Sequence, residues 1–235
     1  MSDKHLSSQF DAALNLLSTQ LLEMGGLVES QISSVLSLLS KFDDAVVSGV
    51  RDIEKRLDQM EVEVDDEINN VIARRQPAAR DLRLLMATSK CVTNLERAGD
   101  EAWKIAKRLQ RIEDAGVATA MQVAELRNSG EMALTILHRA LDAFARMDVA
   151  AAAQIMRDDL AIDNEFRLFV QRLVADMNAA PSTISSCLDY LFVAKAIERI
   201  GDHATNIAEF VIYVVKGRDV RHLPLGRLEE EIQRN

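Results

Sequence analysis

The sequence has few cysteine, proline, glycine and aromatic residues. Its 235 residues include 2 Cys, 3 Pro, 9 Gly and 4% aromatic side chains. The scarcity of turn-forming residues, and the lack of alternating apolar patterns with turn dipeptides, argue against a β-sheet protein and favour helices. Cys91 and Cys187 each stand alone in an apolar stretch without a CxxC pattern. We therefore expect two buried, reduced thiols rather than a disulfide.

Long hydrophobic runs and clusters of basic residues are also missing. The longest uninterrupted apolar run extends from Phe210 to Val215, whereas a helix needs about 20 apolar residues to cross a bilayer. The segment from Met1 to His5 lacks the apolar core of a signal peptide. A net charge of −9 without a basic run argues against binding to nucleic acid. We expect a cytoplasmic protein with no membrane insertion.

Apolar residues, which make up 48% of the chain, recur at steps of three and four and predict six helices. Asp43 and Asp44 are good N-caps for the second helix, Pro77 forces a boundary before the third, and Ser182 is a candidate cap for the sixth. Leu160 and Leu188 fall in the fifth and sixth apolar stripes. The stripes cover residues 10–39, 46–71, 84–112, 132–144, 155–173 and 188–214.

One pentapeptide pattern is written twice in this series of helices. Glu96-Arg-Ala-Gly-Asp100 recurs 102 residues later as Glu198-Arg-Ile-Gly-Asp202, and residues 95–107 agree with 197–209 at seven of thirteen positions. The predicted fold is all-α, with two tandem pseudo-symmetric three-helix bundles of long antiparallel helices that abut without a flexible linker. The predicted repeats are residues 1–115 and 116–217, followed by a partly helical tail, 218–235.

Each copy carries carboxylates at a four-residue step, which places them on one face of a helix. Glu96 with Asp100, and Glu198 with Asp202, form the repeated pairs, and a second pair occurs on the helix before each of them. Packing of the neighbouring helices would give two four-carboxylate patches. The first consists of Glu61, Asp65, Glu96 and Asp100, and the second of Asp159, Asp163, Glu198 and Asp202.

Like charges at this spacing repel, and a bound cation is the simplest compensation. Ligands that are all oxygen suit Mg²⁺, Mn²⁺, Ca²⁺ or Fe³⁺ better than zinc. The alternative is that the acids form solvated helix faces, with Arg97 and Arg199 as salt-bridge partners. Both readings remain open at this point.

Glycine and lysine residues near the patches refine the metal hypothesis. Gly99 and Gly201 lie in helix interiors, where each costs up to about 1 kcal/mol relative to Ala, so we expect a neighbouring helix to approach closely there. The two patches differ in the residues next to them. Lys104 and Lys107 share a face with Asp100, whereas Asn206 and Glu209 share one with Asp202. The second patch is therefore the better candidate for a cation.

No catalytic grouping can be proposed from spacing. The histidines His5, His138, His203 and His222 are scattered, without a Ser-His-Asp or Cys-His arrangement. A di-iron oxidase of the ferritin type would need Glu-x-x-His, but Glu198 and His203 are five residues apart. We predict a non-enzymatic protein in which His203 lies beside the patch rather than binding a metal.

The segment Glu198-Arg-Ile-Gly-Asp-His-Ala-Thr-Asn-Ile-Ala-Glu209 resembles the signature of the PhoU family, regulators of bacterial phosphate uptake. The resemblance extends over nearly the whole chain, through Met24-Gly-Gly-Leu-Val-Glu29, Arg75-Gln-Pro-Ala-Ala-Arg-Asp-Leu-Arg83, Leu141-Asp-Ala-Phe-Ala-Arg-Met-Asp148 and Tyr213-Val-Val-Lys-Gly217. It implies paired three-helix bundles. Acidic pairs of the form Glu/Asp-x-x-x-Asp resemble sites that hold metal clusters in some members.

The resemblance further implies a negative regulator of phosphate uptake and of the phosphate-starvation response. Its implied partners are the ATPase subunit of the high-affinity phosphate ABC transporter and a phosphate-sensing histidine kinase, which would bring it to the periphery of the inner membrane. Divalent or ferric ions (Fe, Mn or Mg) are the implied cofactors, and the resemblance does not establish that signalling requires them. We also expect a homodimer, which is common among long-helix proteins of this type.

Two other classes remain as alternatives. A metal-binding or iron-storing helical protein would hold many ions per assembly, whereas a regulator would hold a few. A passive coiled-coil scaffold would need strict heptads, but the stripes here are broader and contain successive steps of four.

Overall fold

The computed structural model is all-α, as the sequence predicted. It describes residues 8–116, 120–221, 223 and 226–227, and no strand occurs among them. The six helices are α1 (Ser8–Leu38), α2 (Asp44–Arg75), α3 (Ala79–Ala115), α4 (Ala120–Arg146), α5 (Val149–Ala179) and α6 (Ile184–Lys216). His5 and His222 lie outside the described residues, as does most of the predicted tail.

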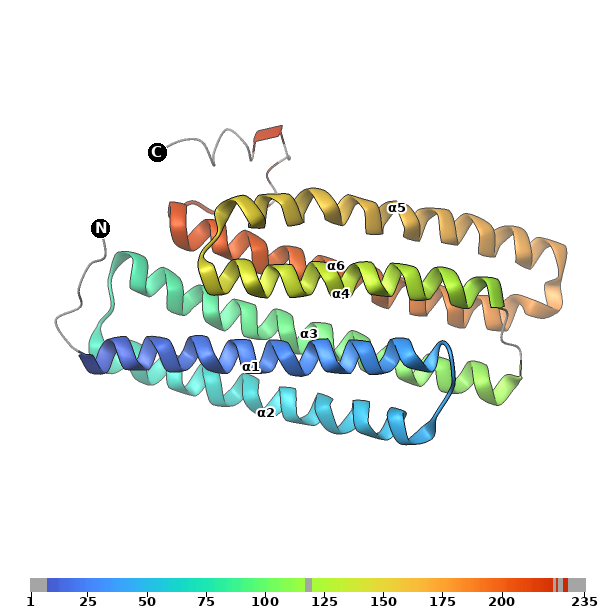
Figure 1. Ribbon diagram of the computed structural model, residues 1–235, viewed down its shortest axis with the longest axis horizontal. Helices are drawn as coiled ribbons and strands as arrows, with labels where there is room; N and C mark the ends of the chain where they lie inside the picture. The colour runs from blue at the N-terminus through green and yellow to red at the C-terminus, as the bar shows by residue number, and fades with distance from the viewer. Residues whose placement is uncertain (1–7, 117–119, 222, 224–225, 228–235) are drawn as a thin grey trace.

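The helices form two three-helix bundles that lie alongside each other (Figure 1). Helices α1, α2 and α3 pack together, as do α4, α5 and α6, and the two bundles meet where α3 packs on α6 and α1 on α4. Helices α3 and α6 run antiparallel, since Arg83 reaches the carbonyl of Val214 while Arg108 pairs with Asp189. The central pair α3 and α6 therefore contacts both bundles, and α2 and α5 lie outside it.

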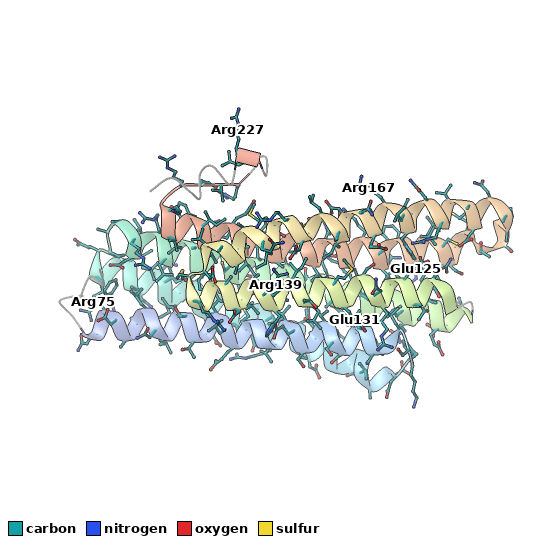
Figure 2. All side chains as sticks on the ribbon, turned by 45° about the horizontal axis from the view of Figure 1, so that its top comes forward. Arg75, Glu125, Glu131, Arg139, Arg167 and Arg227 are labelled. Atoms are coloured by element: carbon teal, nitrogen blue, oxygen red, sulfur yellow. The ribbon has the colours of Figure 1, made fainter. Side chains whose placement is uncertain are left out.

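The predicted apolar stripes form the core. In α1, Leu21, Met24, Val28 and Val35 are fully buried. Alanines along α3 and α6, such as Ala98, Ala102, Ala204 and Ala208, are also fully buried, so these two helices can approach each other closely. Charged side chains, Glu131 of α4 and Arg167 of α5 among them, cover the outside (Figure 2).

Two members of the predicted stripes were assigned wrongly to the core. Leu160 on α5 is 53% exposed and Leu188 on α6 is 43% exposed. Each lies at the edge of its stripe, where a neighbouring helix does not reach, because the packing partner determines the width of the buried face. Cys91 and Cys187 are both buried and free, in agreement with the sequence prediction.

Local signals fix most helix ends. The Asp43 carboxylate accepts a hydrogen bond from the backbone N–H of Ala45 at 2.8 Å, and Gln76 ends α2 in the left-handed conformation directly before Pro77. Gly116 and Gly217 end α3 and α6 in the same conformation. The prediction of Ser182 as a cap was wrong, because Pro181–Thr183 forms a short 3-10 turn and Thr183 precedes α6 without a side-chain cap.

Candidate functional site: two carboxylate patches flanking the central helices

The acids of the second predicted patch lie on the facing sides of α5 and α6. Burial, followed by the charge of Asp202, raises the pKa of Asp159 to about 6, and Asp163 and Glu198 add to the shift. Burial and the charges of Glu198 and Asp163 likewise raise the pKa of Asp202 to about 6. Each of the four predicted carboxylates therefore lies within the electrostatic field of the others.

Gly201 allows this convergence. A Cβ atom at Gly201 would come within 2.8 Å of Asp159 Oδ1 and 3.1 Å of Ile162 Cδ1. The missing side chain therefore makes room for the Asp159 carboxylate over the backbone of α6. The close helix approach expected at this glycine is confirmed.

Glu198 has a cationic neighbour. The Lys195 ammonium lies 2.6 Å from Glu198 Oε1 and 2.5 Å from Oε2, and it also lies 5.3 Å from the centre of the Phe166 ring. The ion pair holds the Glu198 side chain, which is only 13% exposed, at the edge of the patch. A metal ion bound to Glu198 would have to displace the ammonium group of Lys195, which the long lysine side chain allows.

The first patch lies between α2 and α3, and the acids closest to Glu96 are not entirely those that the sequence predicted. Burial, then the charges of Asp100, Glu61 and Asp58, raise the pKa of Glu96 to about 7. Glu61 and Asp100 therefore lie near Glu96 as predicted. Asp58, which the sequence reasoning missed, lies there as well.

Asp65 makes a different contact. Its Oδ1 accepts a hydrogen bond from the Ser89 hydroxyl at 2.7 Å, about two helical turns before Glu96 on α3. Glu54 lies one turn before Asp58 on α2. Burial, followed by the charges of Asp58 and Asp100, raises the pKa of Glu54. The four-residue spacing of Glu54 and Asp58 could have indicated that these two acids share a face of α2. The sequence does not show which acids of α2 lie opposite Asp100, because it does not give the register of α2 against α3.

Gly99, the counterpart of Gly201 in the first copy, also allows a close approach of neighbouring side chains. A Cβ atom there would come within 2.4 Å of Leu57 Cδ1 and 2.9 Å of Gln31 Oε1. Gln31 is fully buried, and its Nε2 donates to the carbonyl of Val50 at 3.0 Å. At this glycine the close neighbour is thus an apolar side chain of α2 rather than a carboxylate.

Of the lysines and the histidine near the patches, Lys104 borders the first patch, whereas Lys107 and His203 make other contacts. Lys104 Nζ lies 3.9 Å from Asp100 Oδ2 and 3.0 Å from Glu101 Oε1, so a cation occupies the edge of the first patch. Lys107 lies over the Trp103 ring. His203 Nδ1 lies 3.0 Å from Asn94 Oδ1, so the imidazole faces α3 and not the carboxylates of α5.

The donor set fits a hard cation, since it consists of carboxylate oxygens whose charges oppose one another. As positioned, no three His, Cys, Asp or Glu side chains of the described residues converge tightly enough to hold an ion. Binding would require rotamer changes at these partly exposed side chains. The eight predicted ligands therefore stay a prediction, to which the geometry adds Asp58.

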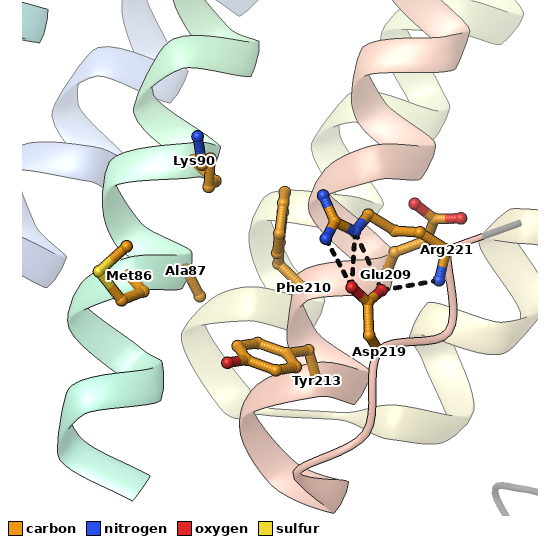
Figure 3. A pocket seen from close by; sticks show the side chains of 8 residues that line it. All are labelled: Met86, Ala87, Lys90, Glu209, Phe210, Tyr213, Asp219 and Arg221. Carbon is orange, nitrogen blue, oxygen red and sulfur yellow. Dashed lines mark hydrogen bonds and ion pairs between the residues drawn. The ribbon is translucent and has the colours of Figure 1, made fainter. Parts of the chain in front are cut away.

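A separate pocket of about 190 Å³ lies where α3, α6 and the segment after α6 meet (Figure 3). Arg221 binds Asp219 through two nitrogens and lies 5.7 Å from the centre of the Phe210 ring. Burial raises the pKa of Glu209, which lines this pocket, to about 7. The sequence reasoning did not anticipate the pocket, because the contact of Arg221 with Phe210 depends on how the chain turns back after Gly217.

Comparison with known proteins identifies the family. The PhoU domain family matches the chain twice, over residues 21–109 and 126–211. The chain belongs to the PhoU family. Each of the two PhoU matches contains one predicted patch.

Curated PhoU relatives are similar over almost their entire length. A Burkholderia protein named phosphate-specific transport system accessory protein PhoU homolog is 52% identical over 232 residues, which cover 98% of this chain and 99% of the relative. The Escherichia coli K12 protein of the same type, named phosphate-specific transport system accessory protein PhoU, is 41% identical and covers 97% and 94%.

Solved PhoU structures share the fold. The crystal structure of PhoU from Pseudomonas aeruginosa superimposes with a TM-score of 0.86 at 41% identity and covers 89% of this chain and 100% of that one. PhoU from Streptococcus pneumoniae, titled a phosphate transport system regulatory protein, gives 0.83 at 25% identity and covers 90% and 99%. The paired three-helix architecture is thus that of the PhoU family.

Proposed function

We propose that this protein is a non-enzymatic accessory regulator of phosphate transport. The observation that carries the proposal is the 52% identity to a phosphate-specific transport accessory protein homolog over the full length of both chains. Identity at this level preserves the fold, which is also that of the solved PhoU structures. Among the described residues, none of the helices has the length and hydropathy that crossing a bilayer requires. We propose a cytoplasmic location at the periphery of the transporter.

We further propose that the protein is a negative regulator of phosphate uptake and of the phosphate-starvation response. It links the ATPase subunit of the high-affinity phosphate ABC transporter to a phosphate-sensing histidine kinase and restrains the starvation response when phosphate is plentiful. The protein acts as a homodimer, and carboxylates of the two patches hold divalent or ferric ions. Raised pKa values in both patches support the last point, since a cation would relieve the repulsion between the carboxylates.

Deletion of the gene in the native host tests the regulatory role. We expect higher expression of phosphate-starvation genes in phosphate-rich medium, restored by the intact gene on a plasmid. Unaltered expression in the deletion strain would count against the proposal. Co-purification from phosphate-replete cells should recover the transporter ATPase or the histidine kinase, and recovery of neither would remove the proposed link.

A metal-binding or iron-storing protein is the second candidate, favoured by the two carboxylate patches. Elemental analysis of the purified assembly separates the two functions. A few ions per chain would fit a regulator with metal sites, whereas storage requires many ions per assembly.

A further inference from the structure

An exposed apolar ridge runs along the first half of α6. Ile184, Leu188 and Phe192 follow one another at steps of four, on one side of the helix, and are 43%, 43% and 50% exposed. Burying side chains of this size would stabilise a complex, so an exposed row of three is a candidate interaction surface.

Two arginines of α3 border this ridge. The Arg108 guanidinium lies 4.3 Å from the centre of the Phe192 ring and 2.8 Å from Asp189 Oδ1, and Arg111 Nε lies 3.8 Å from the same oxygen. Asp189 is buried, whereas the Arg111 side chain is 62% exposed. The buried Asp189 carboxylate therefore holds both arginines by ion pairs, and the remaining N–H donors of their guanidinium groups are directed to the surface.

The same arrangement is repeated further along the contact between α3 and α6. Buried Glu101 Oε1 accepts from Lys104 Nζ at 3.0 Å and from Arg199 Nη1 at 3.0 Å, and both cationic side chains are about half exposed. Four cations thus surround two buried carboxylates, and Asp100 lies 3.9 Å from Lys104, which leaves an excess of one positive charge at the surface of a chain whose net charge is −9. We call this region the seam surface; it consists of Lys104, Arg108, Arg111, Arg199, Ile184, Leu188 and Phe192.

The corresponding residues of the other copy are exposed as well. Leu82, Met86 and Lys90 precede the ridge residues by 102 positions, and Leu82 and Met86 are 39% and 43% exposed. Met86 and Lys90 line the pocket with Phe210 (Figure 3), beside the segment after Gly217, in which Val220 is buried and Arg221 lies over Phe210. The two related surfaces therefore differ in what borders them: the segment after α6 lies beside the first, and two arginines of α3 lie beside the second.

We propose that the seam surface docks an acidic amphipathic helix of a partner protein. The apolar residues of that helix would pack on Ile184, Leu188 and Phe192, and its carboxylates would meet Arg111, Arg199 and Lys104. From Ile184 to Arg199 the surface is about 22 Å long, which matches about 15 residues of helix. A second copy of this chain is disfavoured, because an isologous contact uses the same surface of both copies, and the exposed charges of that surface are cations while Glu101 and Asp189 are buried.

A synthetic peptide tests the proposal directly. The probe is a fluorescein-labelled 15-residue helix with Leu at positions 1, 5, 8 and 12 and Glu at most others. One control peptide has the same composition with the leucines scrambled, and another has Lys in place of Glu. We expect the acidic helix to bind the full chain with a Kd on the order of 10 µM, and both controls to bind at least about tenfold more weakly.

Variants at exposed positions locate the binding site. The double variant Leu188→Gln with Arg111→Glu should weaken binding of the acidic helix at least about tenfold. The matched control, Val174→Gln on α5 with Arg51→Glu on α2, changes equally exposed residues elsewhere and should bind as the parent does. Circular dichroism checks that both variants keep the helical fold.

Several outcomes would overturn the inference. These are no binding at 200 µM peptide, equal binding of the lysine or scrambled peptide, or equal losses in the test and control variants. Conversion of a dimer to a monomer by Leu188→Gln with Arg111→Glu, measured by sedimentation, would assign the surface to a second copy instead. The peptide assay measures no gene expression, so its failure is distinguishable from failure of the regulatory proposal.

Discussion

Asp159 of α5 places a carboxylate oxygen where a side chain at Gly201 of α6 would stand, 2.8 Å from the position of the missing Cβ atom. The glycine of the repeated pentapeptide and the carboxylate of the neighbouring helix thus form one structural unit. Glycine lowers helix propensity at position 201, but the missing side chain leaves the space that the Asp159 carboxylate occupies in the candidate metal site.

Replacement of Gly201 by Ala should leave stability nearly unchanged, since a gain of up to about 1 kcal/mol in helix propensity is offset by displacement of Asp159. It should nevertheless weaken cation binding at the second patch. The matched control is Gly26→Ala on α1, which meets no atom within 4 Å. The control should raise the free energy of unfolding by about 0.5–1 kcal/mol and leave cation binding intact, as measured by urea denaturation and calorimetric titration with Mn²⁺.

Removal of two ligands of the second patch, Glu198→Ala with Asp202→Ala, should lower metal occupancy after gel filtration. The helical circular dichroism should stay the same, because both side chains lie at the edge of the groove. The exposed residue Glu23 supplies the control Glu23→Ala. Equal metal content in all three proteins by elemental analysis would refute the assignment.

The first patch should bind cations more weakly than the second, although each has a lysine at its edge, Lys104 near Asp100 and Lys195 on Glu198. Asp65 is engaged by the Ser89 hydroxyl about two helical turns from Glu96, whereas the charges of Asp163, Glu198 and Asp202 all act on Asp159. Glu96→Ala with Asp100→Ala should therefore remove less bound Mn²⁺ than the corresponding change in the second patch. A larger loss from the first patch would reverse the predicted order.

Glu209 should make stability depend on pH. Its pKa rises from 4.5 to about 7 on folding, mainly through burial. Its contribution to stability is therefore fully present below pH 4.5 and is lost as the pH rises through about 7. Glu209→Gln should raise the free energy of unfolding at pH 8 by on the order of 1 kcal/mol and change it little at pH 4.

Denaturation of the Glu209 variant at several pH values measures this difference. The exposed residue Asp114 supplies the control Asp114→Asn, which should follow the parent at every pH. A difference between Glu209→Gln and the parent that does not change with pH would contradict the assignment.

Glu101 should hold the two bundles together. Its Oε1 accepts hydrogen bonds from Lys104 of α3 and Arg199 of α6. Glu101→Gln should cost about 1–2 kcal/mol, because a buried charged acceptor is replaced by a neutral amide while both cations can still reach water. Exposed Glu113 on the same helix gives the control Glu113→Gln, which should have little effect in urea denaturation.

The fold was predictable because apolar residues repeat at helical spacing over long segments and Pro77, Pro181 and Gly116 interrupt them. The proximity of Asp159, Asp163, Glu198 and Asp202 could also be predicted, since these acids follow from the repeat, whereas their role as metal ligands stays a prediction. The inclusion of Asp58 and the contact of Asp65 with Ser89 could not, because they depend on how far α2 slides along α3. Leu188 was misassigned for a related reason, since the sequence does not show where a neighbouring helix ends.

Gly116 and Gly217 end their helices in the same left-handed conformation, but the chain continues differently after each. After Gly217 a few residues fold back over Phe210, whereas after Gly116 the chain continues toward α4. The two ends of the contact between α3 and α6 are therefore chemically different, although the halves of the chain are related. One end carries Arg221 over Phe210 and the other carries the exposed row of Ile184, Leu188 and Phe192, so a partner helix that lies along this contact would meet two distinguishable ends.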